Sequence, residues 1–513
     1  MLDQRGQLLR AAVGFAGRSM PSYDRALHAL RTWMDSWAGI GRVAVAMARQ
    51  GYDLQLTRYD EKGWRATLTS IVFAIPGSLL MLFATTGCIG ASSASPTASQ
   101  TVATAPATSA PREESPTLAS SPRIEITPSQ ALVDERVSIR LIGAKPSQRV
   151  TLRARAEDDR RIAWESHATF QADNAGMVDL GLQKPNTGTF HDLDPMGLFW
   201  SMGVQSRLST GSAFVKTGFT PTPISFSAEA DGQVLASATL ERIFVAPDVT
   251  QTTVRDNGLA AVFFKPSGSS KYPAIIVVGG SEGGIGFGRR TGAVLASHGY
   301  ATLGLAYFAY PGLPSDLVNI PLEYFETAIL WLQSRDDIQA DKIAVVGQSR
   351  GGELALILGS TFPHIKSVVA YVPSDRIGGR RSGNTGGINP PAWTYRGTPL
   401  PINDLIRVEK INGPVLLISA GDDRIWPSAP MSERVIKRLA DNNFPYPYWN
   451  LYYKAAGHAA GFPYMPTTEE TRPRPHPVLG VMVTSGGTPR DNAFLRSDSW
   501  PQVLKFLEES LKR

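Results

Sequence analysis

The sequence predicts a β-sandwich followed by a doubly wound α/β domain whose sheet is mostly parallel. Two patterns indicate this fold class. Residues 123–250 alternate apolar and polar side chains between turns rich in Pro, Gly and Ser, as sandwich strands do. In residues 251–513, short apolar runs alternate with helical patterns. Such alternation is typical of parallel strands that helices cover on both faces.

Size and composition limit the classes of function. The chain has 513 residues, 42% of them hydrophobic, which is enough for more than one buried core. The formal charge of +6 is small for a chain of this length, and the sequence has no stripe of Lys and Arg interleaved with aromatic residues. We therefore expect no nucleic-acid partner. The single cysteine, Cys88, excludes an intrachain disulfide and a metal site built on Cys. The seven histidines do not pair at ligand spacing, and we expect no metal and no cofactor.

The N-terminal part has the features of an export signal. Residues 1–65 form a basic leader to which the sequence assigns no role, and residues 66–88 are apolar but interrupted by Pro76. A basic stretch, a short apolar stretch and small residues at a junction describe a signal segment. Cys88 follows Thr-Thr-Gly, which resembles a bacterial lipoprotein cleavage site, although Thr85 stands where Leu is usual. Cys88 would then be lipidated. An uncleaved signal anchor and a buried helix of a soluble protein are the alternatives.

Residues 89–122 are rich in Ala, Ser, Thr and Pro and have almost no large apolar side chains. Such a segment cannot offset its ordering entropy by burial, so we expect a disordered linker. A tether after a membrane attachment point is consistent with export. The basic flank before residue 66 then places the two domains outside the membrane. We therefore expect membrane association through residues 66–88 or Cys88, with a cytoplasmic protein as the alternative.

The α/β domain supplies its strands in order. We expect strands in the runs YPAIIVVGG, YATLGLAYF, KIAVVG, IKSVVAYV, GPVLLISAG and PYWNLYYKAAGH, and a helix in EYFETAILWLQSR. Ser349 follows one of these strands in Gly-Gln-Ser-Arg-Gly, and a helical pattern follows it. A serine projects above a sheet only if the chain turns sharply, so Gly347 and Gly351 meet a steric need. This context predicts that Ser349 is a nucleophile.

A serine nucleophile needs a base, and the base needs a carboxylate that orients it. In this type of site the chain order is Ser, acid, His. Two adjacent carboxylates, Asp422 and Asp423, end a later strand, and we favour Asp423 because it stands four residues before a Pro. His458 follows the last strand between small residues. His476 lies in a proline-rich loop and is interpreted as a surface residue.

The oxyanion of the reaction also needs donors. We expect the backbone N–H of Arg350, together with backbone N–H groups of Ser281 and Glu282 in the glycine-rich loop 280–284. The same loop does not predict nucleotide binding. No Gly-Lys-Ser/Thr follows it, and it lacks a dinucleotide fingerprint with a distant acidic residue.

Residues from about 123 to 513 resemble the acyl-CoA thioesterase / bile acid-CoA:amino acid N-acyltransferase family. The stretches that carry this resemblance are GTFHDLDPMGLFWSM, PLEYFETAILWL, VVGQSRGGELAL, AGDDRIWPS, AGHAAGFPYMP and GGTPRDNAFLRSDSWPQVLKFLEESL, which occur in the family's order. The resemblance implies an immunoglobulin-like N-terminal sandwich joined to an α/β-hydrolase domain. It also implies Ser349 as nucleophile, Asp423 as acid and His458 as base.

The family resemblance implies a thioester hydrolase. Members that transfer bile acyl groups tend to have cysteine at the nucleophile position, whereas this chain has Ser349, so hydrolysis of acyl-CoA through an acyl-serine intermediate is expected. Arg376, Arg380 and Arg381 cluster in an insertion that covers the site, where they could meet the CoA phosphates. A solvated loop is the other interpretation of these arginines.

Two further functions stay open. The export features favour a lipoprotein that cleaves other acyl esters or amides outside the membrane, because acyl-CoA is a cytoplasmic metabolite. A third hypothesis is an envelope-binding protein without catalytic activity. The presence of Ser349, Asp423 and His458 in the expected order argues against this last hypothesis.

Overall fold

The computed structural model describes residues 121–205, 213–379, 390–475 and 482–512, and the backbone of four short strands before them. The chain forms two compact units, Met1–Glu113 and Glu114–Arg513. In the first unit the described strands form one antiparallel sheet in the order β1 (Met47–Arg49), β2 (Tyr52–Leu54), β3 (Ile71–Ile75) and β4 (Ser78–Leu82). Strands β3 and β4 fall in the predicted signal or anchor segment.

The predicted lipidation site, Cys88, lies outside the described residues. Within the described ranges, no helix combines the length and the apolar character that crossing a bilayer requires.

Residues 121–246 of the second unit are built from strands; we call them the β module. One sheet has the order β10 (Val178–Asp179), β7 (Ser138–Ile142), β5 (Arg123–Thr127). The other has the order β11 (Thr187–Gly188), β9 (Ala163–Gln171), β8 (Arg149–Glu157), β13 (Thr222–Ala230), β14 (Gln233–Ile243), β6 (Gln130–Leu132), with β12 (Gly203–Val204) also on β9. One described helix, α3 (Gly197–Trp200), accompanies them. Alternating side chains of both sheets form one apolar core, as the period-two pattern of the sequence requires.

The remaining residues form the α/β domain around an eight-stranded sheet. Its order is β15 (Val249–Val254), β16 (Ala260–Pro266), β18 (Ala301–Ala306), β17 (Tyr272–Val278), β20 (Ile338–Gln348), β21 (Ile365–Tyr371), β24 (Val415–Ala420), β25 (Tyr448–Tyr453). The pairs from β18 onward are parallel, and the first two pairs are antiparallel. Each strand run expected from the sequence coincides with all or part of one of these strands.

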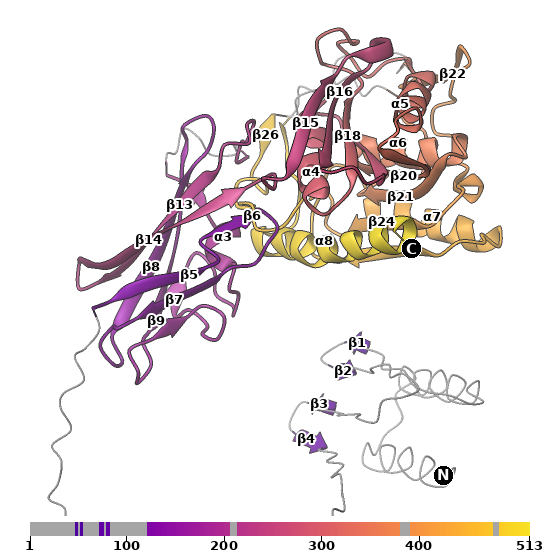
Figure 1. Ribbon diagram of the computed structural model, residues 1–513. Helices are drawn as coiled ribbons and strands as arrows, with labels where there is room; N and C mark the ends of the chain where they lie inside the picture. Colours follow the sequence, from indigo (N-terminus) through magenta and orange to yellow (C-terminus); the bar gives the residue numbers. More distant parts are fainter. Residues whose placement is uncertain are drawn as a thin grey trace, which may run out of the picture. The chain divides into compact units, whose positions relative to one another are not determined.

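Helices cover both faces of this sheet (Figure 1). Neighbouring residues of β17 face opposite sides: Ile276 belongs to the apolar core under α5 (Glu323–Gln333), α6 (Arg350–Thr361) and α7 (Ser428–Asp441). Ile275 belongs to the core under α4 (Gly286–Ser297) and α8 (Pro489–Leu511). The continuous apolar strands of the sequence are thus explained by burial on two faces.

Short elements complete the domain. They are η2 (Asp256–Gly258), β19 (Ile320–Pro321), β22 (Trp393–Tyr395), β23 (Thr398–Pro399), η3 (Val408–Lys410), β26 (Arg474–Pro475) and β27 (Met482–Val483).

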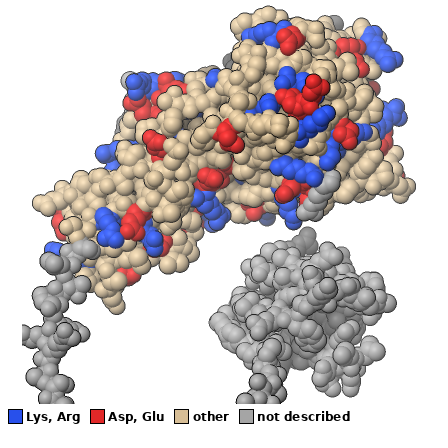
Figure 2. All heavy atoms as spheres, in the orientation of Figure 1, with Lys and Arg blue, Asp and Glu red and all other residues tan. Residues whose placement is uncertain are grey.

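The β module is joined to the α/β domain by buried polar contacts as well as apolar ones. The Asp134 carboxylate, 2% exposed, accepts hydrogen bonds from Trp500 Nε1 of α8 and from the His298 ring after α4, both at 2.7 Å. Helix α8 lies along the sheet with its first turns beside the β module (Figure 1). The face of the molecule in Figure 2 carries basic and acidic side chains interspersed over its surface.

Candidate active site

Ser349 occupies a strained turn between β20 and α6. Its φ is 55° and its ψ is −120°, outside the region that non-glycine residues prefer. A Cβ on Gly347 would lie 2.0 Å from the carbonyl oxygen of Gly351, and a Cβ on Gly351 would lie 2.3 Å from that of Gly279. Glycine is therefore a steric necessity at both flanking positions, and the turn lifts the Ser349 hydroxyl above the sheet.

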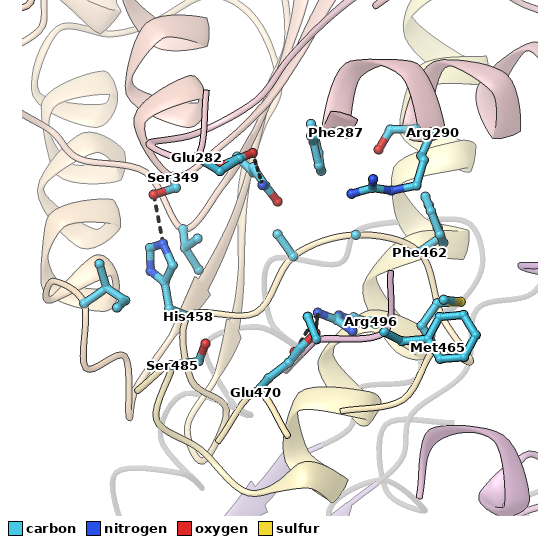
Figure 3. Close-up of a pocket in the computed structure, with 18 of the residues that line it drawn as sticks. Glu282, Phe287, Arg290, Ser349, His458, Phe462, Met465, Glu470, Ser485 and Arg496 are labelled. Atoms are coloured by element: carbon cyan, nitrogen blue, oxygen red, sulfur yellow. Dashed lines mark hydrogen bonds and ion pairs between the residues drawn. The ribbon is translucent and has the colours of Figure 1, made fainter. Parts of the chain in front are cut away.

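His458 lies in the loop after β25 and contacts Ser349. The His458 Nε2 and Ser349 Oγ are 2.9 Å apart, and His458 Nδ1 lies 2.8 Å from Asp423 Oδ2 (Figure 3 shows the first of these contacts). An ionised carboxylate only accepts hydrogen bonds, so Nδ1 carries the hydrogen and Nε2 is free to accept the hydroxyl proton. Trp426 packs edge-on against the imidazole, with ring centroids 5.7 Å apart. This packing limits the orientations that the His458 ring can take.

The two adjacent carboxylates occupy different environments. The Asp423 side chain is fully buried and accepts backbone N–H groups of Ile425 and Trp426 through Oδ1, at 3.0 and 3.2 Å. Asp422 is 41% exposed and turns away to Arg424 and the N–H of Gly487. The Gly487 N–H, with Arg424, lowers the pKa of Asp422. The structure therefore brings Asp423, and not Asp422, to His458.

The predicted oxyanion donors stand around Ser349. In the described part of the chain, the backbone N–H groups of Ser281, Glu282 and Arg350 make no hydrogen bond to a protein acceptor. Ser281 and Glu282 line the same cavity as Ser349. Arg350 begins α6, so its N–H points out of the helix N-terminus, where negative charge is stabilised. These groups are available to a developing oxyanion.

Buried side chains fix the loops that carry these donors. The Tyr307 hydroxyl donates to the carbonyl of Gly279 at 2.7 Å, and burial raises the pKa of Tyr307 well above its usual range, so it stays a donor. The Arg350 guanidinium turns away from the cavity to the fully buried Glu353, at 2.6 Å. Glu353 also accepts from Trp393 Nε1 at 2.9 Å. Sequence analysis did not assign these supporting roles to the side chains of Tyr307, Glu353 and Trp393, because the contacts join residues far apart in the chain.

Ser349 and His458 open onto a cavity of about 370 Å³, shown in Figure 3. Its walls combine aromatic and apolar side chains from the β module and from the α/β domain with four side chains of Lys or Arg and two of Glu. The residues that give it this character are Phe214, Lys216, Phe244, Glu282, Phe287, Arg290, Phe462, Met465, Glu470, Arg474 and Arg496. A cavity of this size and lining is typical of a small-molecule site.

Arg376, the predicted phosphate-binding arginine that falls in the described residues, does not line this cavity. Arg376 is exposed and donates to the carbonyl of Asn403 at 2.7 Å. Arg380 and Arg381 lie outside the described residues, as does His476. Among the described residues, no cluster of three or more His, Cys, Asp or Glu side chains has the geometry of a metal site.

Comparisons with known proteins agree on one family. Residues 134–256 match the acyl-CoA thioester hydrolase/BAAT N-terminal region, and residues 320–382 and 398–513 match the BAAT / acyl-CoA thioester hydrolase C-terminal region. The chain is 31% identical to acyl-coenzyme A thioesterase 6 of Mus musculus, over 74% of this chain and 94% of that protein. It is also 31% identical to acyl-coenzyme A amino acid N-acyltransferase 1 of Mus musculus, over 75% and 97%.

The solved structures that match are more distant in sequence. One is an alpha/beta hydrolase enzyme from a Medee basin deep-sea metagenome library, 18% identical, which covers 40% of this chain and 81% of its own with a TM-score of 0.30.

Proposed function

This chain belongs to the acyl-CoA thioester hydrolase/BAAT family, and from that premise we propose that it is a serine hydrolase that cleaves acyl-CoA to a free acid and CoA. The observation that carries the proposal is the hydrogen-bonded chain from Ser349 through His458 to the buried Asp423. Ser349 lies in a turn that exposes its hydroxyl beside the backbone N–H groups of Arg350, Ser281 and Glu282.

The reaction follows from this geometry. His458 Nε2 takes the hydroxyl proton as Ser349 Oγ attacks the thioester carbonyl. The oxyanion is held by the N–H groups of Arg350 and of the loop with Ser281 and Glu282. The intermediate collapses, the C–S bond breaks, and CoA leaves with the proton that His458 returns. A water molecule then gives its proton to His458 and attacks the acyl-serine, which releases the acid and regenerates Ser349.

Asp423 makes His458 a usable base. Its carboxylate holds the imidazole tautomer that has a free Nε2, and it stabilises the imidazolium that forms in each half of the reaction. The backbone N–H groups of Ile425 and Trp426 donate to this carboxylate and hold it in place.

We favour hydrolysis over transfer to an amino acid because the nucleophile is serine. One relative carries an N-acyltransferase name, so the acceptor requires a direct test. The assay measures thiol release from a chain-length series of acyl-CoAs by the full chain, with and without glycine or taurine. Water as acceptor gives free acid at the same rate in both conditions. Formation of an amide would replace hydrolysis by transfer.

The essential control is Ser349→Ala beside Ser360→Ala. Ser360 lies on the same helix, and its hydroxyl only donates to the carbonyl of Ile357. We expect Ser349→Ala to lose thiol release to background, by about 10³-fold or more, and Ser360→Ala to keep it. Thiol release that survives in Ser349→Ala would contradict the assignment.

A second candidate function rests on the export features of the N-terminal region. In it the protein is a lipoprotein or a signal-anchored protein that hydrolyses non-CoA esters outside the membrane, with Cys88 as the lipidated residue. A p-nitrophenyl ester series in parallel with the acyl-CoA series separates the two. Ester cleavage dependent on Ser349, with negligible CoA release, favours the exported esterase. We also propose that the β module is an immunoglobulin-like sandwich, because its two sheets share one core.

A further inference from the structure

The cavity beside Ser349 contains a partly buried cation, Arg290, whose nearest electrostatic partner, Glu282, forms no ion pair with it. Arg290, from the first turns of α4, lines the cavity and lies across it from Ser349 and His458 (Figure 3). Its one hydrogen bond is a 3.3 Å contact from Nη1 to the backbone carbonyl of Lys216. In the described residues it makes no ion pair with a carboxylate. Burial lowers the pKa of the Arg290 guanidinium, which nevertheless stays protonated at neutral pH.

The other basic side chains of the cavity differ from Arg290. Lys216 pairs with Asp159 at 3.0 Å. Arg496 donates to both carboxylate oxygens of Glu470, at 2.8 and 2.9 Å. Arg474 donates to the hydroxyl of Ser485 at 2.8 Å and to the carbonyl of Glu470. Among these four side chains, Arg290 alone has neither a carboxylate nor a side-chain acceptor.

Two more donors around the same cavity lack partners. The Thr291 hydroxyl is buried, lines the cavity and has no hydrogen-bond partner in the described structure. The same is true of Arg496 Nε, whose guanidinium binds Glu470 through Nη2 only. Buried polar groups without partners are costly and uncommon, so a ligand is the natural explanation for a set of donors that share one cavity.

We propose that this cavity takes an acyl group that ends in a carboxylate, with Arg290 and Thr291 as the residues that bind the carboxylate. This deepens the proposed function, on which it rests, by naming dicarboxylic acyl-CoAs as the substrate class. A plain alkyl chain would leave the Arg290 charge buried against methylene groups. A terminal carboxylate accepts two N–H groups of a guanidinium side by side and the threonine hydroxyl as well. The aromatic walls, Phe287 and Phe462, suit the methylene groups between the two ends.

A phosphate of CoA is the competing source of negative charge. CoA is far larger than the ligands that pockets of about 300–1,000 Å³ enclose, and this cavity of about 370 Å³ holds only one end of the thioester. The phosphates lie beyond the long pantetheine arm from the sulfur. The aromatic lining around Arg290 favours the acyl end.

The test compares adipyl-CoA with hexanoyl-CoA, which have acyl chains of equal length, on the full chain and on Arg290→Met. We expect the wild-type protein to prefer adipyl-CoA in kcat/KM. We expect Arg290→Met to reduce kcat/KM for adipyl-CoA by about 10- to 100-fold and to leave that for hexanoyl-CoA unchanged or higher. Arg290→Lys keeps the positive charge but not the planar guanidinium, so its kcat/KM for adipyl-CoA should lie between those of the wild type and Arg290→Met.

Arg289→Met is the matched control. Arg289 is the preceding residue of α4, but its guanidinium lies over the Phe219 ring and donates to the carbonyl of Thr217, and it does not line the cavity. We expect it to keep the wild-type preference. Equal losses for both substrates in Arg290→Met, absent with the corresponding N-acetylcysteamine thioesters, would assign Arg290 to a CoA phosphate and overturn the proposal. No change with either substrate would overturn it too.

A binding measurement keeps the proposal testable apart from thioesterase activity. Adipate should raise the melting temperature of the wild-type protein and of Arg289→Met, but not of Arg290→Met, and hexanoate should raise it less. Adipate binding dependent on Arg290 would support the subsite even if Ser349-dependent thiol release failed, in which case only the proposed reaction would be wrong. A shift equal in wild type and Arg290→Met would refute the subsite, and so would no shift.

Discussion

The substitution Asp423→Asn tests how the site activates Ser349. The Asp423 carboxylate is fully buried and accepts one hydrogen bond from His458 and two from the backbone. In the variant, the amide oxygen can keep the backbone donors of Ile425 and Trp426, which turns the NH₂ group toward His458 Nδ1. His458 must then accept at Nδ1 and carry its hydrogen on Nε2. In that tautomer it cannot take the proton from Ser349.

The expected magnitude is large because the wrong tautomer removes the base. A loss of about 10⁴-fold in kcat is typical of this substitution in a Ser-His-Asp site. At about 1.4 kcal/mol per factor of ten, this corresponds to roughly 5–6 kcal/mol of transition-state stabilisation. The melting temperature should change little, because the amide keeps the shape of the carboxylate and the backbone hydrogen bonds. The assay is steady-state thiol release, with KM measured separately.

Asp422→Asn is the matched control at the neighbouring position. Asp422 is 41% exposed and contacts Arg424 and Gly487, and exposed ion pairs contribute only about 0–1 kcal/mol. We expect its kcat to stay within about fivefold of the wild type. The reasoning fails if Asp423→Asn keeps more than a tenth of the activity, or if the two variants are impaired equally while both remain folded.

Two further predictions concern the fold that carries the site. Gly351→Ala should lower the free energy of unfolding by about 3 kcal/mol or more, because the added Cβ would lie 2.3 Å from the Gly279 carbonyl oxygen. Gly218→Ala is the control and should change the free energy of unfolding little, because the nearest atom to its Cβ would be 3.9 Å away. Urea unfolding compares the two variants, and equal stability would contradict the steric argument. Hydrogen bonds from Arg438 lower the pKa of Glu409 to about 2, so Glu409→Gln should lower the free energy of unfolding at pH 7. The difference in stability between variant and wild type should shrink as the pH falls from about 4.5 toward 2, because Glu409 then becomes protonated in both the folded and the unfolded state. A difference that stays constant from pH 7 to pH 3 would refute this prediction.

Much of the α/β domain could be predicted because its signals are local. The expected strands inside the sheet, such as β17 and β24, are short apolar runs, and burial on both faces of one sheet requires such runs without alternation. The helix expected in EYFETAILWLQSR is α5. Ser349 and His458 could be chosen because each follows a strand of one parallel sheet, and the carboxyl ends of such strands meet at one edge.

The adjacent carboxylates mark the limit of this kind of reasoning. Asp422 and Asp423 both follow β24, and the sequence favours Asp423 only through its distance from a later proline. What separates them is a loop in which the N–H groups of Ile425 and Trp426 bind one side chain, while Gly487 from a distant segment binds the other. A long-range contact of that kind leaves no local pattern in the sequence.

The arginines show why substrate contacts are harder to predict than catalytic ones. Positive charge in an insertion suggested that Arg376 binds a phosphate. In the structure, however, the Arg376 side chain is exposed, donates to the backbone carbonyl of Asn403 and does not line the cavity. Arg290 lies on the helix α4 beside a second arginine, a pattern that would ordinarily indicate a solvated face. The β module covers that face: the carbonyl groups of Lys216 and Thr217 accept from Arg290 and Arg289. The packing of the β module against the α/β domain therefore converts a surface cation into a partly buried one, and a cavity cation that forms no ion pair in the described part of the chain suits a negatively charged substrate.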